Sequence, residues 1–339
     1  MRSILIILFC FIAVFSTAQR RILVCQQPGT QCFKTIQEAI NSVPDSSALP
    51  YEIYIMSGTY HEQLLIAKNN ILITGELRDK VIVTSSIARD SFRCSHPDDW
   101  GVATINIKGN DVYLRNLTVK NTFGFDFTEE RTIPCANDTA GHLKKLTRTG
   151  HQMAVRLMKG TRFSAVNCTF SSFGGDTMSP WDVENGVFYF NECRFEGGVD
   201  LFCPRGFSFA ENCEFHAYNG PAIIWHDGSK NPNSISVLKN CKFNGYEGFS
   251  LGRYHRDAQM LLVDCQFSAQ MKDAPVYHVQ KSTDVQWGHR IYYKNCHRAT
   301  GDYGWMADNA PEELMAKYGS TTKFMINTGW MPERKLINE

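Results

Sequence analysis

Short runs of alternating apolar and polar residues recur along most of the chain, and they predict β-strands. They occur at Tyr51–Met56, Ile71–Thr74, Val81–Thr84, Val112–Val119, Val187–Phe190 and Leu261–Val263. Gly, Asn and Asp separate the runs, and no convincing helical periodicity lies between them. Strands that follow one another without intervening helices argue against a βαβ sheet.

A phrase of Asn, Asp or Glu followed by Cys, and usually by Phe two positions later, closes many of these runs. It occurs at Asn167–Phe170, Glu192–Phe195, Asn212–Phe215, Asn240–Phe243, Asp264–Phe267 and Asn295–His297. Its cysteines are spaced 20 to 31 residues apart, a period typical of solenoids. The pattern predicts a parallel β-helix, in which equivalent residues stack about 4.8 Å apart and the cysteines form an inward ladder of small apolar side chains.

Two helices are predicted outside this repeat. Thr35–Val43 places its apolar residues on one face and is followed by Pro44, and we expect it to cap the N-terminal end of the solenoid. Pro311–Tyr318 begins with a proline suited to a first helical turn, and we expect it to pack against the outside or the far end. The predicted fold class is therefore all-β: a parallel β-helix with an N-terminal capping helix.

The first residues, Met1–Gln19, have the features of a cleavable secretory signal. Arg2 precedes the apolar run Ile4–Phe15, and the small residues Ser16–Ala18 follow it. The run is shorter than the roughly 20 residues of a membrane-spanning helix. We therefore expect a secreted or periplasmic protein in which residues 20–339 form one β-helical domain, acting as a monomer and not at a membrane.

The charge balance and the cysteine spacing limit the kinds of partner, disulfide and metal site that we expect. The 35 Lys and Arg residues nearly balance the 34 Asp and Glu residues, which gives no reason to expect a nucleic acid partner. Of the 12 cysteines, one lies in the signal, and the pairs Cys25/Cys32 and Cys94/Cys135 are each candidates for a disulfide. The other seven are assigned to the repeat. They occur singly rather than as paired ligands, so a metal site is not expected.

A polar constellation follows the period of the repeat. Gln152, Asp176 and Asp200 are spaced 24 residues apart, and Arg253 follows Asp200 by 53 residues, about two coils. Apolar neighbours predict that Gln152 and Asp200 point outward. Arg253 has the same parity as Leu251, so it shares this face only if a turn or bulge intervenes at Gly252.

Two carboxylates on adjacent coils repel each other, so their pKa values should separate, and a nearby Arg would decide which one stays ionised. This division of labour suits covalent ester hydrolysis, in which one carboxylate attacks while the other protonates the leaving alkoxide and later activates water. The spacing alone is equally compatible with two solvated surface aspartates.

Seven phrases, in their order along the chain, resemble the pectinesterase family, carbohydrate esterase family eight. They are Phe33–Ile40, Gly58–Glu62, Asn116–Thr122, Gln152–Val155, Gly175–Met178, Val199–Phe202 and Leu251–Arg253. The resemblance implies a right-handed, pectin-lyase-like β-helix. It also implies hydrolysis of methyl esters on the galacturonate carboxyl groups of pectin, with a pectic polysaccharide as partner and no metal or organic cofactor.

The resemblance also implies roles for individual residues. Asp200 matches the family's nucleophile and Asp176 its acid/base. Arg253 matches the arginine that holds the nucleophile, and Gln152 matches the first glutamine of the oxyanion site. The second oxyanion glutamine is replaced by Gly175, for which backbone N–H groups of the Gly174–Gly175 turn are possible substitutes.

Further departures concern substrate contact. Tyr254 and His255 replace a Pro-Trp pair, and Trp225-His226-Asp227 stands where the family has an Ala-Gln-Gly type of phrase. We predict that these aromatic and histidine residues contact substrate, as does Gly175, with Trp225 as a subsite wall and with His255 either binding substrate or simply lying on the surface. The long segment between Asn121 and Gln152 carries basic residues that either meet unesterified uronates or are only solvated.

Two rival functions remain open at this stage. One is a β-helical pectin lyase or glycosidase that cuts the polymer chain. The other is a non-catalytic polysaccharide-binding β-helix, which the loss of a glutamine at Gly175 makes conceivable.

Overall fold

The structure is a computed structural model that describes residues 21–27, 31–45, 47, 50–137, 141–182, 184–220, 223–227, 230–279 and 285–332. The predicted signal, residues 1–19, lies outside these residues. None of the described helices is long and apolar enough to span a membrane.

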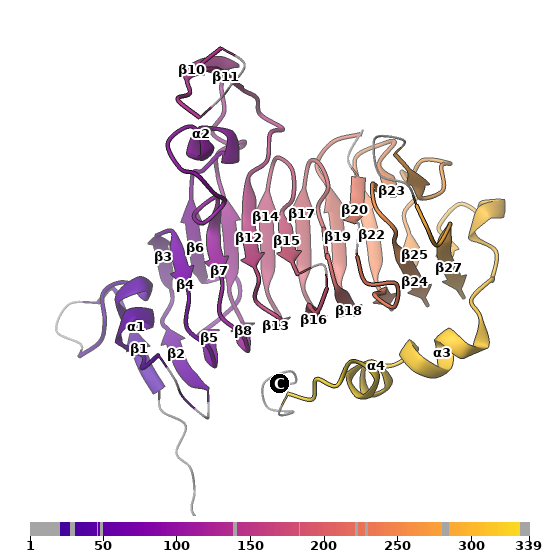
Figure 1. The fold of residues 1–339 in the computed structure, drawn as a ribbon, viewed down its shortest axis with the longest axis horizontal. Helices are drawn as coiled ribbons and strands as arrows, with labels where there is room; N and C mark the ends of the chain where they lie inside the picture. Colours follow the sequence, from indigo (N-terminus) through magenta and orange to yellow (C-terminus); the bar gives the residue numbers. More distant parts are fainter. Residues whose placement is uncertain are drawn as a thin grey trace, which may run out of the picture.

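Parallel strands form three faces of an elongated stack of coils (Figure 1). The first sheet contains β1 (Arg21–Val24), β2 (Tyr51–Ile55), β5 (Ile71–Gly75), β8 (Val112–Arg115), β13 (Arg162–Val166), β16 (Val187–Asn191), β18 (Phe207–Glu211), β21 (Ser236–Lys239), β24 (Gln259–Val263) and β27 (Arg290–Lys294). The second sheet contains β3 (Gly58–His61), β6 (Val81–Ser85), β9 (Thr118–Asn121), β14 (Thr169–Ser172), β17 (Arg194–Gly197), β19 (Glu214–Ala217), β22 (Lys242–Gly245), β25 (Gln266–Phe267) and β28 (His297–Arg298).

The third face joins two smaller sheets. One contains β4 (Leu64–Ile66), β7 (Ala103–Ile107), β12 (Met153–Met158) and β15 (Met178–Trp181), and the other contains β20 (Ile223–Asp227), β23 (Ser250–Tyr254) and β26 (Tyr277–His278). Phe202 bridges them by pairing with Met178 on one side and Trp225 on the other. Because the chain visits the faces in turn and advances one strand per coil, the predicted parallel β-helix is confirmed.

The Asn-Cys phrase makes the corner between the first and second sheets. In its first position Asn167, Asn212 and Asn240 adopt φ values of 50° to 55°, a left-handed conformation that Asn tolerates better than most residues. The Asn240 side-chain amide donates to Oδ1 of Asn212 at 2.7 Å, so neighbouring corners are tied together. The repeat is therefore set by the turn as much as by the core.

The following Cys and Phe residues of each phrase point inward. The phenylalanine rings stack from coil to coil with centroids 4.8 to 5.6 Å apart. The cysteine ladder is confirmed for six buried residues, Cys168, Cys193, Cys213, Cys241, Cys265 and Cys296. The assignment of Cys203 to the ladder is wrong, because Cys203 follows Phe202 on the third face instead.

Helix α1 (Ile36–Ser42) covers the N-terminal end of the core, as predicted. Thr35 caps it by accepting a hydrogen bond from the Glu38 N–H at 3.2 Å. Glu62, from the coil beneath, accepts from the N–H of Ile36 at 2.9 Å and places a negative charge at the helix N-terminus.

Two C-terminal helices, α3 (Glu312–Tyr318) and α4 (Thr321–Thr328), run back along the outside of the first sheet (Figure 1). Phe324 of α4 packs on Phe209 of β18 with ring centroids 5.3 Å apart. The outward face of this sheet thus gains a second apolar cluster. The outside position predicted for α3 is confirmed, whereas α4 and the short helix η1 (Gly304–Met306) were not predicted.

Both cysteine pairs considered from the sequence are disulfides, Cys25–Cys32 and Cys94–Cys135. The second joins α2 (Arg89–Arg93) to the hairpin of β10 (Arg131–Pro134) and β11 (Leu143–Leu146). This hairpin is part of the long inserted segment and projects beyond the coils (Figure 1).

Candidate active site on the third face

The predicted row of Gln152, Asp176 and Asp200 occupies one position in three successive coils. His151 pairs with Gly175, and Gly175 pairs with Val199, which places the three following residues in register. Asp176 and Asp200 both adopt a left-handed backbone, with φ of 61° and 47°. Such conformations cost free energy in a non-glycine residue and are concentrated at functional sites.

One carboxylate oxygen of Asp200 accepts a hydrogen bond, and the other has no hydrogen-bond partner among the described residues. Arg253 donates from Nη2 to Oδ2 of Asp200 at 2.7 Å. Oδ1 is buried and has no hydrogen-bond partner among the described residues. Burial raises the pKa of Asp200, and the ion pair with Arg253 opposes that rise. The carboxylate is therefore fixed in orientation with one oxygen left for chemistry.

Asp176, one coil away, lies in a denser polar environment. The hydroxyl of Ser179 donates to Oδ2 at 3.3 Å, and the thiol of Cys203 donates to Oδ1 at 3.5 Å. Nη1 of Arg205 lies 3.9 Å from Oδ2, and Nε2 of the half-exposed His151 lies 3.9 Å from Oδ1.

The charges around Asp176 decide its ionisation. Burial alone would raise the pKa of Asp176, but Arg205, His151, His226 and Arg156 outweigh burial and lower that pKa to about 2. Burial and Arg205 in turn lower the pKa of His226 to about 3, so His226 is neutral near pH 7. Arg205 is therefore the largest of the charges that lower the pKa of Asp176.

The pKa values of the two aspartates are separated, as expected, but in the opposite order to the one predicted from the sequence. Arg253 was expected to make Asp200 the more readily ionised carboxylate, whereas the pKa is raised for Asp200 and lowered for Asp176. Burial dominates at Asp200, whereas at Asp176 the surrounding charges, Arg205 first, outweigh burial. Arg205 and Arg156 are positioned together, with guanidinium groups 4.2 and 4.5 Å from the ring centroid of Trp181.

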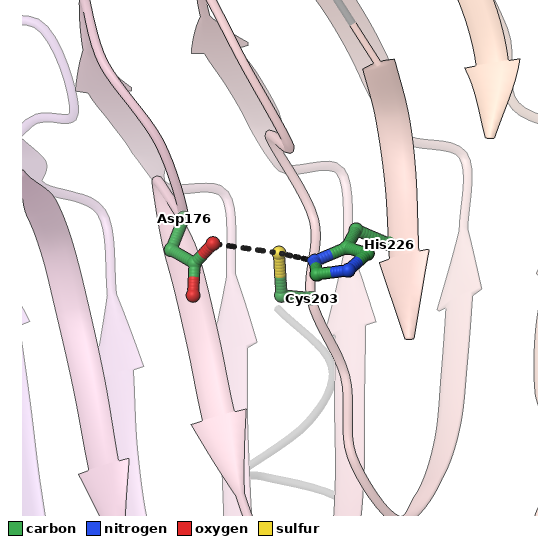
Figure 2. A group of neighbouring side chains, drawn as sticks. All are labelled: Asp176, Cys203 and His226. Carbon is green, nitrogen blue, oxygen red and sulfur yellow. Dashed lines mark hydrogen bonds between the residues drawn. The ribbon is translucent and has the colours of Figure 1, made fainter. Parts of the chain in front are cut away.

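A second polar row runs beside the aspartates, one residue from each coil. Arg156 pairs with Ser179, and His226 pairs with Arg253. Cys203 lies between them, since Phe202 pairs with both Met178 and Trp225. Figure 2 shows Asp176, Cys203 and His226 converging from neighbouring coils.

Sequence reasoning missed the roles of His151, Ser179, Cys203 and Arg205 in this site. For Ser179 and Cys203 the signal was present in the same period that located the aspartates, because residues 156, 179, 203 and 226 are spaced 23 to 24 residues apart. It was overlooked because no single residue type repeats along the row.

Gln152 is not exposed, because the inserted segment, through Gly124 and Arg148, covers it. Its side chain is fully buried, and the amide is already engaged with backbone. Nε2 donates to the carbonyl oxygen of Arg148 at 2.7 Å, and Oε1 accepts from the N–H of Gly124 at 2.7 Å. The Gly175 N–H donates to the Gly150 carbonyl at 3.1 Å, so the substitute oxyanion donor expected at Gly175 is also engaged.

Two predicted substrate contacts are wrong. Trp225 is 0% exposed, and its indole N–H donates to Ser236 Oγ at 3.1 Å. Tyr254 is 3% exposed, with its hydroxyl 3.1 Å from Nδ1 of His289. Both rings pack in the core, so neither forms a subsite wall.

The predicted histidines and arginine do lie at the site. His255 is partly exposed, and its Nδ1 lies 2.6 Å from Nε2 of His226. Leu251 and Tyr254 are both core residues although they are three positions apart, so the alternation shifts phase within β23. This shift resolves the parity conflict and lets Arg253 face outward.

Three basic residues of the inserted segment, Lys144, Lys145 and Arg148, have partners within the protein. The guanidinium of Arg148 lies 3.7 Å from the ring centroid of Phe173, Nζ of Lys144 lies 3.7 Å from Oδ1 of Asp90, and Lys145 pairs with Glu130.

Comparison with known proteins supports the resemblance seen in the sequence. Residues 21–140 match the family model "Pectinesterase". The chain is 36% identical over 103 residues to pectinesterase A of Dickeya chrysanthemi, covering 30% of this chain and 28% of that protein. It is 26% identical over 224 residues to pectinesterase 2 of Citrus sinensis, covering 65% and 38%. The chain thus spans less than two-fifths of the length of either relative.

Solved structures show the same fold. A pectin methylesterase in complex with a hexasaccharide aligns with a TM-score of 0.71 at 18% identity, covering 93% of this chain and 99% of that one. The pectin methylesterase from carrot aligns with a TM-score of 0.71 at 19% identity, covering 96% and 98%. The resemblance to pectinesterases predicted from the sequence is therefore confirmed.

Proposed function

We propose that this protein is a carboxylic ester hydrolase of the pectinesterase type, which removes methyl esters from galacturonate carboxyl groups of pectin. One observation carries the proposal: the buried Asp200 has one oxygen anchored by Arg253 and the other without a partner, next to a second buried aspartate. A buried, unsatisfied carboxylate oxygen is costly in a folded protein and is retained where it serves chemistry. The similarity to pectinesterases supports the same conclusion.

In the proposed reaction, Oδ1 of Asp200 attacks the ester carbonyl carbon and forms an acyl-enzyme, while Arg253 keeps the other oxygen in place. The methoxide leaves with a proton from Asp176, which then deprotonates the water that hydrolyses the acyl-enzyme. A low pKa makes Asp176 a poor acid in the free protein. Binding of an anionic polymer removes water and adds negative charge, and both changes raise the pKa of Asp176 towards a useful value.

The oxyanion of the tetrahedral intermediate needs a hydrogen-bond donor, and the Gln152 amide is engaged elsewhere. We assign this role to His151, whose side chain is 50% exposed and lies beside Asp176. A single donor of this kind predicts slower turnover than a pair of glutamines would give.

We further propose that the protein is exported to the cell exterior or the periplasm and acts there on a pectic polysaccharide. The two disulfides support this location, because such bonds persist in oxidising compartments. The N-terminal signal predicted from the sequence agrees with it.

A serine-based mechanism has no support from the fold. Gly248–Gly252 matches a Gly-x-Ser-x-Gly motif, but Ser250 begins strand β23, and the next element in the described chain is strand β24 rather than a helix. The sharp strand-to-helix turn that activates such a serine is therefore missing.

The test is to incubate the mature protein with highly methylated pectin and to measure methanol, acetate, reducing ends and unsaturated products in parallel. The proposal predicts methanol without new chain ends. New reducing ends or unsaturated products in the absence of methanol would instead identify a glycosidase or a lyase.

A second candidate, a non-catalytic pectin-binding β-helix, is favoured by one observation: the Gln152 amide and the Gly175 N–H are both engaged with backbone. It predicts that pectin binding survives Asp176→Ala and that no methanol appears at any pH.

A further inference from the structure

We propose that Asp176, Cys203 and His226 form a binding site for a zinc-type divalent cation, with Asp200 as a fourth ligand, and that the bound ion blocks ester hydrolysis. Asp176, Cys203 and His226 come from three successive coils, and their ligand atoms lie within 4.8 Å of one another (Figure 2).

The distances match the requirements of a tetrahedral site. Sγ of Cys203 lies 3.5 Å from Oδ1 of Asp176 and 3.8 Å from Nδ1 of His226. Oδ2 of Asp200 lies 3.6 Å from the same Nδ1. Zinc bonds of about 2.3 Å to sulfur and about 2.0 Å to nitrogen or oxygen place tetrahedral ligands about 3.3 to 3.5 Å apart. These three separations exceed the tetrahedral values by no more than a few tenths of an ångström.

Two further observations point to a ligand at this place. The Asp200 carboxylate has Oδ2 3.6 Å from Nδ1 of His226, and its other oxygen, Oδ1, is buried without a hydrogen-bond partner among the described residues. His226 has its Nε2 2.6 Å from Nδ1 of His255, so the N–H can be fixed on Nε2 with the lone pair of Nδ1 directed toward Cys203. Metal-binding histidines commonly have their second nitrogen fixed in this way.

The donor set selects the class of ion. A thiolate, an imidazole and carboxylates suit zinc or cobalt, whereas calcium and magnesium take oxygen ligands. Binding would deprotonate Cys203, giving three anionic ligands with the two carboxylates. The guanidinium groups of Arg205 and Arg253 lie close enough to offset the charge in excess of that on the metal.

The ladder cysteines do not offer such a set. They lie in the interior of the coils and face one another and the phenylalanine stack. Cys203 differs because it lies on the third face beside a histidine and an aspartate.

The blocking effect rests on the proposed function, because the ion would occupy both the proposed nucleophile, Asp200, and its partner, Asp176. Metal binding itself does not depend on that function, so the two can be tested separately.

Binding is measured by titrating the full mature protein with Co²⁺, following the thiolate-to-cobalt charge-transfer band, and then displacing the cobalt with Zn²⁺. The expected result is one Co²⁺ per chain with this band. Cys203→Ser should abolish the band and weaken Zn²⁺ binding at least tenfold. The matched control Cys296→Ser, in the ladder, should leave both unchanged. A wild-type protein with no thiolate band, or a Cys203→Ser variant that binds Zn²⁺ as tightly as wild type, would overturn the site.

Inhibition is measured as methanol release with and without one equivalent of Zn²⁺. We expect wild type to lose at least nine-tenths of its activity and Cys203→Ser, which keeps both aspartates, to become resistant. Full methanol release by zinc-loaded wild type would refute the blocking effect. A protein that binds Co²⁺ through Cys203 but releases no methanol without metal would refute the proposed function and leave the site standing.

Discussion

Gly175→Gln should increase ester hydrolysis, because it would supply the donor that the family places just before the acid/base residue. The position can accept a side chain. A Cβ atom at Gly175 would meet its nearest neighbour, Cδ2 of His151, at 3.5 Å, an ordinary contact, and φ is not in the left-handed region. At Gly174, in contrast, a Cβ would lie 2.0 Å from the carbonyl oxygen of Gly150.

The gain can be bounded. One oxyanion donor contributes about 2.7 to 4 kcal/mol to transition-state stabilisation in well-studied hydrolases. Ordering a glutamine side chain costs about 1.5 to 2 kcal/mol, which leaves about 0.7 to 2.5 kcal/mol. We therefore expect kcat/KM to rise roughly 3- to 60-fold, since 1.4 kcal/mol is about tenfold.

The assay is methanol release from methylated pectin by wild type, Gly175→Gln and Gly175→Met. The methionine variant is matched in length and has no hydrogen-bond donor, so it should show no gain. Thermal unfolding would establish that all three proteins fold alike. If Gly175→Gln is folded but no faster than wild type, or if Gly175→Met is equally fast, the reasoning about the missing donor is refuted.

Three other changes test separate parts of the structure. Arg253→Met removes the charge that opposes the raised pKa of Asp200, so that pKa should rise further and the acid limb of the kcat/KM profile should move to higher pH; an unmoved limb would contradict this. Trp225→Phe should lower the free energy of unfolding by about 1 to 2 kcal/mol, because the hydrogen bond to Ser236 is lost, and KM for pectin should not change. A raised KM would indicate instead that Trp225 contacts the substrate. His226 has a pKa of about 3 when folded and about 6.5 when unfolded, so the unfolded state binds the extra proton and stability should fall as pH falls through that window. His226→Asn should flatten this dependence in melting curves taken between pH 7 and pH 4, and an equally steep curve would argue against it.

The fold could be predicted because its turns and core use the same residues in every coil. The left-handed corner favours Asn, and the space behind it takes Cys and Phe, so the period is visible in the sequence. The same period located Asp176 and Asp200, because equivalent positions in consecutive coils are necessarily neighbours.

Side-chain direction was predicted less well where strict alternation fails. Ile224 and Trp225 are adjacent and both buried, so the parity argument that exposes one of them does not hold. Gln152 is covered by the inserted segment, whose Gly124 binds its amide, and no local pattern indicates that contact.

The electrostatics of the site could not be predicted from spacing alone. The pKa of Asp176 depends on Arg156 and Arg205, which are brought together by two different coils and by Trp181 between their guanidinium groups. The separate location of Cys203 could not be recognised from the sequence, because the six other free cysteines among the described residues all belong to the ladder.

The central claim is that Asp200 attacks the ester, and methanol release by Asp200→Asn tests it most directly. Asparagine keeps the size of the side chain and can still accept from Arg253, so the variant should fold and melt like wild type. We expect its methanol release to fall about 10⁴-fold or more, as it does when other hydrolases lose their nucleophile. Methanol release within about tenfold of wild type, from an Asp200→Asn protein of verified mass, would contradict the account.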